Sequence, residues 1–154
     1  MYAETAGAVR RSPMEDSVSV ALRFRSGALG TFFLSDAAPS PWTWEQGTGE
    51  SPLFPWSGQN SMRFMGDRAS LEFPNLRLWR CAADHGDWTR RPQPEDIPVR
   101  AGDAFMLQLE HFCAVLRGET TPLLSVEDAI GTLRAVLAVA RAAATGERQG
   151  TADS

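Results

Sequence analysis

Strict alternation of apolar and polar residues over Ser17–Phe24 is the feature that most constrains how this chain folds. The stretch SVSVALRF puts small or charged side chains on one side of an extended backbone and apolar ones on the other, namely Val18, Val20, Leu22 and Phe24. A period of two is typical of a strand with one buried face. Gly27, in the following RSG, can adopt the positive φ of a three-residue hairpin loop. We therefore predict a β-hairpin whose return strand spans Ala28–Ser35.

Short strands and then two helices follow the hairpin. Three apolar stretches read as a meander, Ser61–Gly66, Ser70–Pro74 and Leu76–Cys81, with a weaker strand over Asp96–Val99. A helix is predicted over Ala104–Arg117, with Asp103 as N-cap and Gly118 as the stop. Ser125 and Asp128 form a capping-box pattern at the start of a second helix that ends near Gly146. Strands followed by helices predict an α+β fold, a mostly antiparallel open sheet with helices on one face.

The return strand of the hairpin carries large apolar residues on both sides. Leu29 and Phe33 lie on one side, and Phe32 and Leu34 lie on the other. Helices that cover one face of the sheet leave the second face exposed, and monomers rarely tolerate such a patch. We therefore expect a homodimer through the open sheet face, with two-fold symmetry as the commonest closed arrangement.

The segment from Asp36 to Gln59 is rich in proline and glycine, which predicts a long loop without regular structure. It contains PSPWTWEQ, in which Trp42 and Trp44 stand two residues apart and are followed by Glu45 and Gln46. Aromatic faces with a few polar groups are typical of a sugar or polyol pocket. The alternative is that both indoles pack beneath the loop and fasten it to the sheet. The residues alone leave the two interpretations open.

Motifs that carry chemistry are weak elsewhere. GTGESP at Gly47–Pro52 begins like a dinucleotide-binding fingerprint but ends in proline and follows a loop, so we interpret it as a turn. DHGD at Asp84–Asp87 could hold a metal or move a proton, although a polar turn is the favoured interpretation. His111 is expected to be partly buried or capping, and no metal site is predicted. Lysine is absent, so this chain supplies no lysine nucleophile or proton donor.

Composition excludes several functional classes. The net charge is −4 and the arginines are scattered, which argues against a nucleic-acid or membrane-surface partner. No apolar run approaches the roughly 20 residues that a membrane-spanning helix needs. Two cysteines stand far apart, at Cys81 and Cys113, without metal-ligand spacing. We therefore expect a cytoplasmic globular domain.

Three stretches resemble the C-terminal domain of the Gfo/Idh/MocA oxidoreductases, the glucose-fructose oxidoreductase and inositol dehydrogenase relatives. They are EDSVSVALRFRSGALGTFFLSDAAPSPWTWEQ, MGDRASLEFPNLRLWR and QLEHFCAVLRGETTPLLSVEDAIGTLRAVLAVARAAATGE. The resemblance implies a domain that contacts substrate and mediates assembly, beside a separate Rossmann domain that binds NAD or NADP. The family's catalytic and cofactor motifs have no counterpart here, so no catalytic or cofactor-binding residue is assigned and no cofactor is expected to bind this chain.

The resemblance also implies an organisation and a function. Residues 1–16 are interpreted as an extended lead-in from an N-terminal domain, 17–146 as the sheet-plus-helices domain, and 147–154 as a polar tail. The start MYAETAGAVRR then reflects a fragment, a misassigned gene start or a truncated paralogue. The implied function is substrate binding and assembly in an NAD(P)-dependent oxidoreductase acting on a sugar, polyol or related small molecule. The alternative is a non-enzymatic binding or oligomerisation module. Trp42, Trp44, Glu45 and Gln46 are the implied substrate-binding residues, and Arg10 and Asp36 are secondary candidates.

Overall fold

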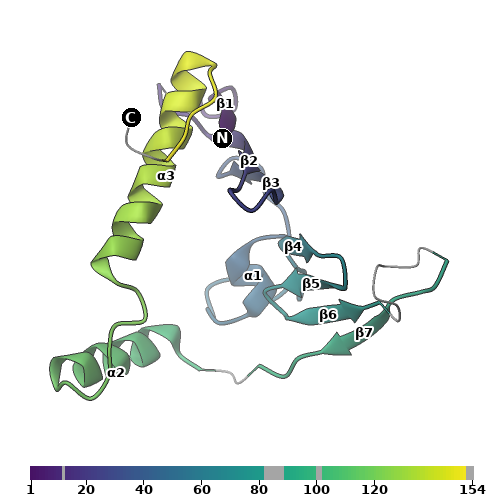
Figure 1. Cartoon of the computed structure of the whole chain (residues 1–154), viewed down its shortest axis with the longest axis vertical. Coiled ribbons are helices and arrows are strands. Elements are labelled where there is room, and N and C mark those ends of the chain that lie inside the picture. The colour runs from purple at the N-terminus through teal and green to yellow at the C-terminus, as the bar shows by residue number, and fades with distance from the viewer. Residues whose placement is uncertain (12, 82–88, 100–101, 152–154) are drawn as a thin grey trace. The chain divides into compact units, whose positions relative to one another are not determined.

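The computed structural model describes residues 1–11, 13–81, 89–99 and 102–151. The chain divides into two compact units (Figure 1). The first consists of Met1–Pro39 and Thr121–Ser154, and the second of Ser40–Thr120. Both contain open antiparallel sheets, and helices occur in both, so the predicted α+β class is confirmed. The strands form two separate sheets, one in each unit.

The first unit contains a three-stranded antiparallel sheet in the order β1 (Tyr2–Ala6), β2 (Ser17–Arg23) and β3 (Leu29–Ser35). The predicted hairpin is β2–β3, and Gly27 closes it with φ 92°. β1 lies within the segment predicted to be an extended lead-in, and it pairs with β2 along its full length. The tail is hydrogen-bonded as well, because the Gln149 N–H donates to the Met1 carbonyl over 2.9 Å.

Helix α3 (Val126–Thr145) packs against β1 through its C-terminal half (Figure 1). Its capping box is formed as predicted by Ser125 and Asp128, and Gly146 ends it with φ 68°. Small residues make the contact: Ala142 packs with Ala3 and Val20, and all three are buried. The alternation of β2 therefore points its valines toward α3, as the period of two predicts.

The opposite face of this sheet carries exposed apolar side chains. Phe33 is paired with Ser19 in the register, whereas Phe32 is paired with Val20 on the α3 side. Phe33 and Leu29 therefore lie on the face turned away from α3, and their exposed fractions are 68% and 78%.

The second unit contains a four-stranded antiparallel meander of β4 (Met62–Met65), β5 (Ala69–Phe73), β6 (Arg77–Arg80) and β7 (Gln93–Asp96), in sequence order. The predicted meander strands are confirmed: β4 and β6 are each one residue shorter at both ends, and β5 is shifted by one residue toward the N-terminus. The strand predicted over Asp96–Val99 is wrong in position: β7 spans Gln93–Asp96, so it ends at the residue where the predicted strand begins. Ion pairs fix its register on β6: Arg77 Nε lies 2.7 Å from Asp96 Oδ1, and Arg80 Nε lies 2.7 Å from Glu95 Oε2.

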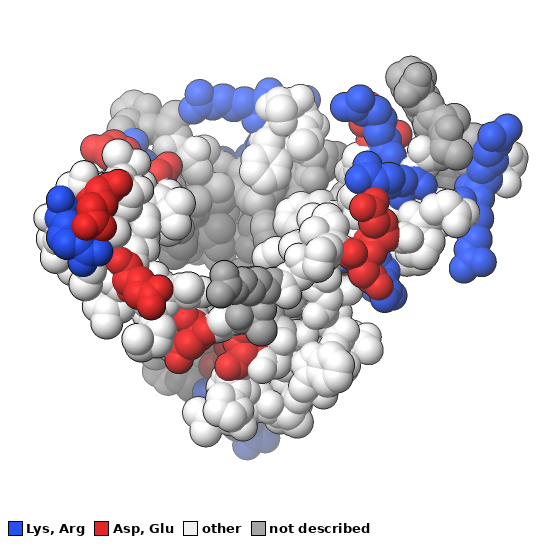
Figure 2. Space-filling model, turned by 90° about the horizontal axis from the view of Figure 1, so that it is seen from below, with Lys and Arg blue, Asp and Glu red and all other residues white. Residues whose placement is uncertain are grey.

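One face of the meander carries charges of alternating sign on successive strands. The register places Arg63, Glu72, Arg77 and Asp96 side by side from β4 to β7. Arg63 Nε lies 3.8 Å from Glu72 Oε1. The Asp96 carboxylate raises the pKa of the Arg77 guanidinium by hydrogen bonding, and Arg77 in turn lowers the pKa of Asp96. Figure 2 likewise shows basic and acidic side chains next to one another on the face that it presents.

Two helices belong to the second unit. α1 (Trp44–Thr48) lies inside the segment predicted to have no regular structure, so that prediction is wrong in part. α2 (Ala104–Leu116) begins where predicted, because the Asp103 carboxylate accepts hydrogen bonds from the Phe105 and Met106 N–H groups at 2.9 and 3.1 Å. The predicted apolar stripe of α2 is exposed to solvent at Phe105, Leu109, Phe112 and Leu116.

Candidate functional site

The first candidate site is the tryptophan loop, Ser40–Asn60, which surrounds α1. Its helix exists because Thr43 is an N-cap: the Thr43 Oγ1 accepts a hydrogen bond from the Gln46 N–H over 3.2 Å. Gly49 ends α1 in the left-handed region, with φ 69°. Sequence reasoning missed α1 because the loop is rich in proline and glycine. The helix is marked by a side-chain cap and not by an apolar repeat.

Trp44, the first residue of α1, packs on the sheet. Its ring centroid lies 5.3 Å from that of Phe73 on β5, with a tilted geometry, and its exposed fraction is 42%. Phe73 also makes an edge-to-face contact with Phe64 on β4, at 6.3 Å. For Trp44, this packing corresponds to the interpretation that the indole fastens the loop to the sheet.

Gly47 allows α1 to approach the end of β5 closely. It is buried, and a Cβ at this position would lie 2.6 Å from the Gln59 carbonyl oxygen and 3.3 Å from Pro74 Cγ. Only a residue without a side chain fits there. The glycine therefore sets the distance between α1 and the sheet, and with it the contact between Trp44 and Phe73.

Ser57 joins the two ends of the tryptophan loop. Its N–H donates to the Gln46 carbonyl over 2.8 Å, and its hydroxyl donates to the Pro41 carbonyl over 2.8 Å. These bonds place Trp42, next to Pro41, and Trp56, next to Ser57, at the same part of the loop. Sequence patterns do not identify Ser57, because an isolated serine in a loop carries no periodic signal.

Trp42 is more exposed than Trp44, with an exposed fraction of 62%. The Glu45 side chain is also exposed, and Gln46 is half-buried. The loop thus exposes both an indole and a carboxylate. Such a surface can stack on an apolar ligand face and accept hydrogen bonds from hydroxyl groups. Whether these four residues contact substrate stays a prediction.

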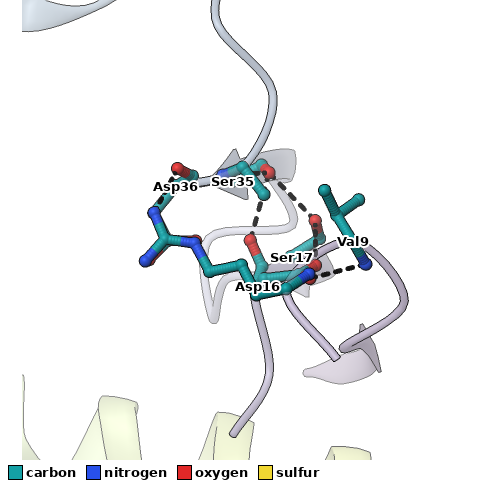
Figure 3. A network of polar contacts seen from close by, with 7 residues as sticks. Val9, Asp16, Ser17, Ser35 and Asp36 are labelled. Atoms are coloured by element: carbon teal, nitrogen blue, oxygen red, sulfur yellow. Dashed lines mark hydrogen bonds and ion pairs between the residues drawn. The ribbon is translucent and has the colours of Figure 1, made fainter. Parts of the chain in front are cut away.

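The second candidate site surrounds the buried carboxylate of Asp16 in the first unit (Figure 3). The Val9 and Arg10 N–H groups donate to its Oδ2 over 2.9 and 3.0 Å, and the Ser17 hydroxyl donates to its Oδ1 over 3.0 Å. Its backbone carbonyl accepts from the Ser35 hydroxyl and the Asp36 N–H, both over 3.1 Å. Asp16 therefore links the β1–β2 connection to the end of β3.

The secondary candidates Arg10 and Asp36 are brought together here. Arg10 Nη1 lies 3.2 Å from Asp36 Oδ2, and its Nη2 donates to the Asp36 carbonyl over 2.8 Å. The N–H of Arg10 is the largest cause that lowers the pKa of Asp16, although burial of the carboxyl opposes it. Because the donors around Asp16 are satisfied by the carboxylate itself, this cluster is a structural clamp rather than a group poised for catalysis.

The sequence also singled out the DHGD motif, His111 and two cysteines. DHGD lies outside the described residues. His111 on α2 is half-buried, as predicted. Within the residues that the structure describes, no group of three or more His, Cys, Asp or Glu side chains could hold a metal ion, and no helix is long and apolar enough to cross a bilayer. Cys81 and Cys113 are free thiols.

Comparison with known families gives one match. Residues 1–150 match the model of an oxidoreductase family, described as its C-terminal alpha/beta domain, GFO_IDH_MocA_C. The chain belongs to this family. The resemblance carried by the hairpin and the terminal helices is thereby confirmed, and the match covers both units of this C-terminal oxidoreductase domain. No curated protein matches the chain.

Proposed function

We propose that this chain is the substrate-binding and assembly domain of an NAD(P)-dependent oxidoreductase that acts on a sugar, polyol or related small molecule, and that it is not catalytic alone. The match to the oxidoreductase C-terminal domain over residues 1–150 carries the proposal. The tryptophan loop supports it, because exposed aromatic and carboxylate groups are held there on an ordered backbone.

The described residues do not fit NAD(P). The glycines of GTGESP lie at the carboxyl end of α1, where the helix dipole disfavours a phosphate, and the space above Gly47 is filled by Gln59 and Pro74. The N-terminus of α2 is already capped by the Asp103 carboxylate, and that of α3 by the Ser125 hydroxyl in a capping box with Asp128. We therefore assign no step of hydride transfer to these residues, and we place cofactor binding outside this domain.

Ligand-observed NMR on the full chain tests the binding role. The probes are a hexopyranoside, a cyclitol and an acyclic hexitol at millimolar concentration. We expect Trp42→Ala to weaken the binding of the best probe about fivefold, since one aromatic contact contributes about 1 kcal/mol. Leu53→Ala is the matched control, because Leu53 is an exposed residue of the same loop. The binding proposal fails if no probe binds, or if Trp42→Ala binds as well as the unmodified chain.

A homodimer is the assembly that we propose. Its interface is the sheet face turned away from α3, on which Phe33 and Leu29 are exposed. The same feature favours the alternative function, a non-enzymatic oligomerisation module. Phe33→Glu would put a charge into this interface and shift the sedimentation coefficient to that of a monomer. Leu34→Glu adds the same charge on the α3 side of the same strand and should leave the dimer intact. Sedimentation of the unmodified chain as a monomer at tens of micromolar would rule out the dimer.

A further inference from the structure

The Trp56 side chain lies next to two glycines, Gly49 and Gly58. Gly49 and Gly58 both have positive φ, 69° and 62°. A Cβ on Gly49 would lie 2.9 Å from Trp56 Cδ1, and a Cβ on Gly58 would lie 3.2 Å from Trp56 Cζ2. The indole edge from Cδ1 through Nε1 and Cε2 to Cζ2 therefore faces backbone that carries no side chains.

The rest of this indole is open to solvent. Trp56 has an exposed fraction of 72%, although a Cβ on either glycine would press against its edge. The backbone of the two glycines on one side of the indole restricts the rotamers that Trp56 can adopt. A ligand that stacks on Trp56 has less side-chain freedom to remove, so the ordering cost of binding is reduced.

A hydrogen bond joins the backbone next to Trp42 to the residue after Trp56. The hydrogen bond from the Ser57 hydroxyl to the Pro41 carbonyl, 2.8 Å long, joins the residues next to the two tryptophans. The Ser57 N–H fixes the same segment to the Gln46 carbonyl. Both exposed indoles are therefore attached to backbone that is held by hydrogen bonds.

We infer that Trp56 is a ligand-stacking residue of the tryptophan loop, pre-positioned by Gly49 and Gly58, and that it selects ligands with a rigid C–H face. This inference rests on the proposed binding function and names a further residue for it. A pyranose ring presents several C–H groups on one flat face, which matches the exposed face of the Trp56 indole. An acyclic polyol must give up torsional freedom to present the same face, so it binds less well.

Saturation-transfer NMR on the full chain tests the inference, with methyl β-D-galactopyranoside and sorbitol as probes. The ring C–H protons of the galactoside should receive the strongest saturation, and sorbitol should bind at least about threefold more weakly. Trp56→Ala should weaken galactoside binding about fivefold, and Trp56→Phe should restore part of it. Circular dichroism checks that each variant retains its fold.

Two glycine-to-alanine substitutions distinguish an effect on ligand stacking from an effect on folding. In Gly58→Ala, the new methyl group would press against the Trp56 indole. We expect galactoside binding to weaken about twofold to threefold, although the methyl group does not touch the ligand. In Gly118→Ala, the backbone strain is similar, because φ is 74°, but no atom lies within 4 Å of the added Cβ. Binding by this control should be unchanged.

The outcomes separate this inference from the binding proposal. If Trp42→Ala abolishes galactoside binding while Trp56→Ala and Gly58→Ala leave it intact, the stacking role of Trp56 is wrong and the binding proposal stands. Equal binding of sorbitol and the galactoside overturns the preference for a rigid face. If the unmodified chain binds neither these probes nor a cyclitol, both the inference and the binding proposal are wrong.

Discussion

Replacement of Gly47 by alanine tests whether close approach of α1 to the sheet positions the tryptophan loop. Gly47 lies in α1 with a backbone conformation that alanine can adopt, so helix propensity alone predicts stabilisation of up to about 1 kcal/mol. The new Cβ would instead lie 2.6 Å from the Gln59 carbonyl oxygen, a backbone atom that cannot swing away. Overpacking of this kind costs about 1–3 kcal/mol, so we expect a net destabilisation of about 1–2 kcal/mol.

Gly131→Ala is the matched control. Gly131 lies in the interior of α3, and no atom lies within 4 Å of a Cβ built there. The propensity gain is then unopposed, and a stabilisation of about 0.5–1 kcal/mol is expected. The two identical substitutions should therefore change the free energy of unfolding in opposite directions, by a difference of about 2 kcal/mol.

Urea unfolding followed by tryptophan fluorescence and by far-UV circular dichroism measures both variants. Near-UV circular dichroism reports on the contact between Trp44 and Phe73, and its signal should weaken in Gly47→Ala alone. If Gly47→Ala stabilises the chain as much as Gly131→Ala, then α1 can move away from the sheet at no cost. The close approach would then have no role in positioning Trp44.

Three further predictions concern the clamp, the loop and the cofactor. Hydrogen bonds lower the pKa of Asp16 in the folded state, so its stabilising effect is fully present above the unfolded pKa of about 3.9 and is lost as the pH falls through the lower folded value. The stability difference between the unmodified chain and Asp16→Asn, measured by urea unfolding, should therefore be largest near pH 6 and should shrink below pH 4; a constant difference would contradict the clamp. Ser57→Ala should lower the free energy of unfolding by about 0.5–1.5 kcal/mol and speed hydrogen exchange of the loop amides, whereas Ser51→Ala should change neither as much. Calorimetric titration with NADH and NADPH should show no binding tighter than about 100 μM, about −5.5 kcal/mol, and tighter binding would refute the placement of the cofactor site outside this domain.

Patterns that repeat along the chain predicted much of this fold. The alternation in SVSVALRF predicted β2 and the face that it buries, and the register on β3 placed Phe33 on the opposite face, as the period of two requires. Ser125, Asp128 and Gly146 predicted the ends of α3, because caps are local and obey strict spacing.

The elements that sequence reasoning missed are held by contacts between distant residues. β1 carries no strong alternation and is a strand because β2 offers it hydrogen-bonding partners. β7 has little apolar content of its own; it pairs with β6 along a backbone ladder, and two exposed ion pairs accompany that pairing. The candidate site was found only in part. The sequence identified Trp42 and Trp44 as candidates because they are aromatic. It did not identify Ser57, Asp16 or Trp56, because their roles depend on contacts with backbone groups that the sequence pattern does not specify.

The distribution of apolar side chains favours assembly over isolated action. The buried hydrophobic residues among those described are small: Ala3, Val20, Ala138 and Ala142. Large ones remain exposed, including Phe33 on the sheet and the stripe of α2 at Phe105, Leu109, Phe112 and Leu116. Full burial of one such side chain contributes about 1.5–3 kcal/mol. A helix of 13 residues is marginal in water without a packed face, so α2 gains stability from any surface that covers its stripe. An interface that buries these exposed apolar side chains would therefore gain the free energy of their burial. This argument supports assembly for either proposed function.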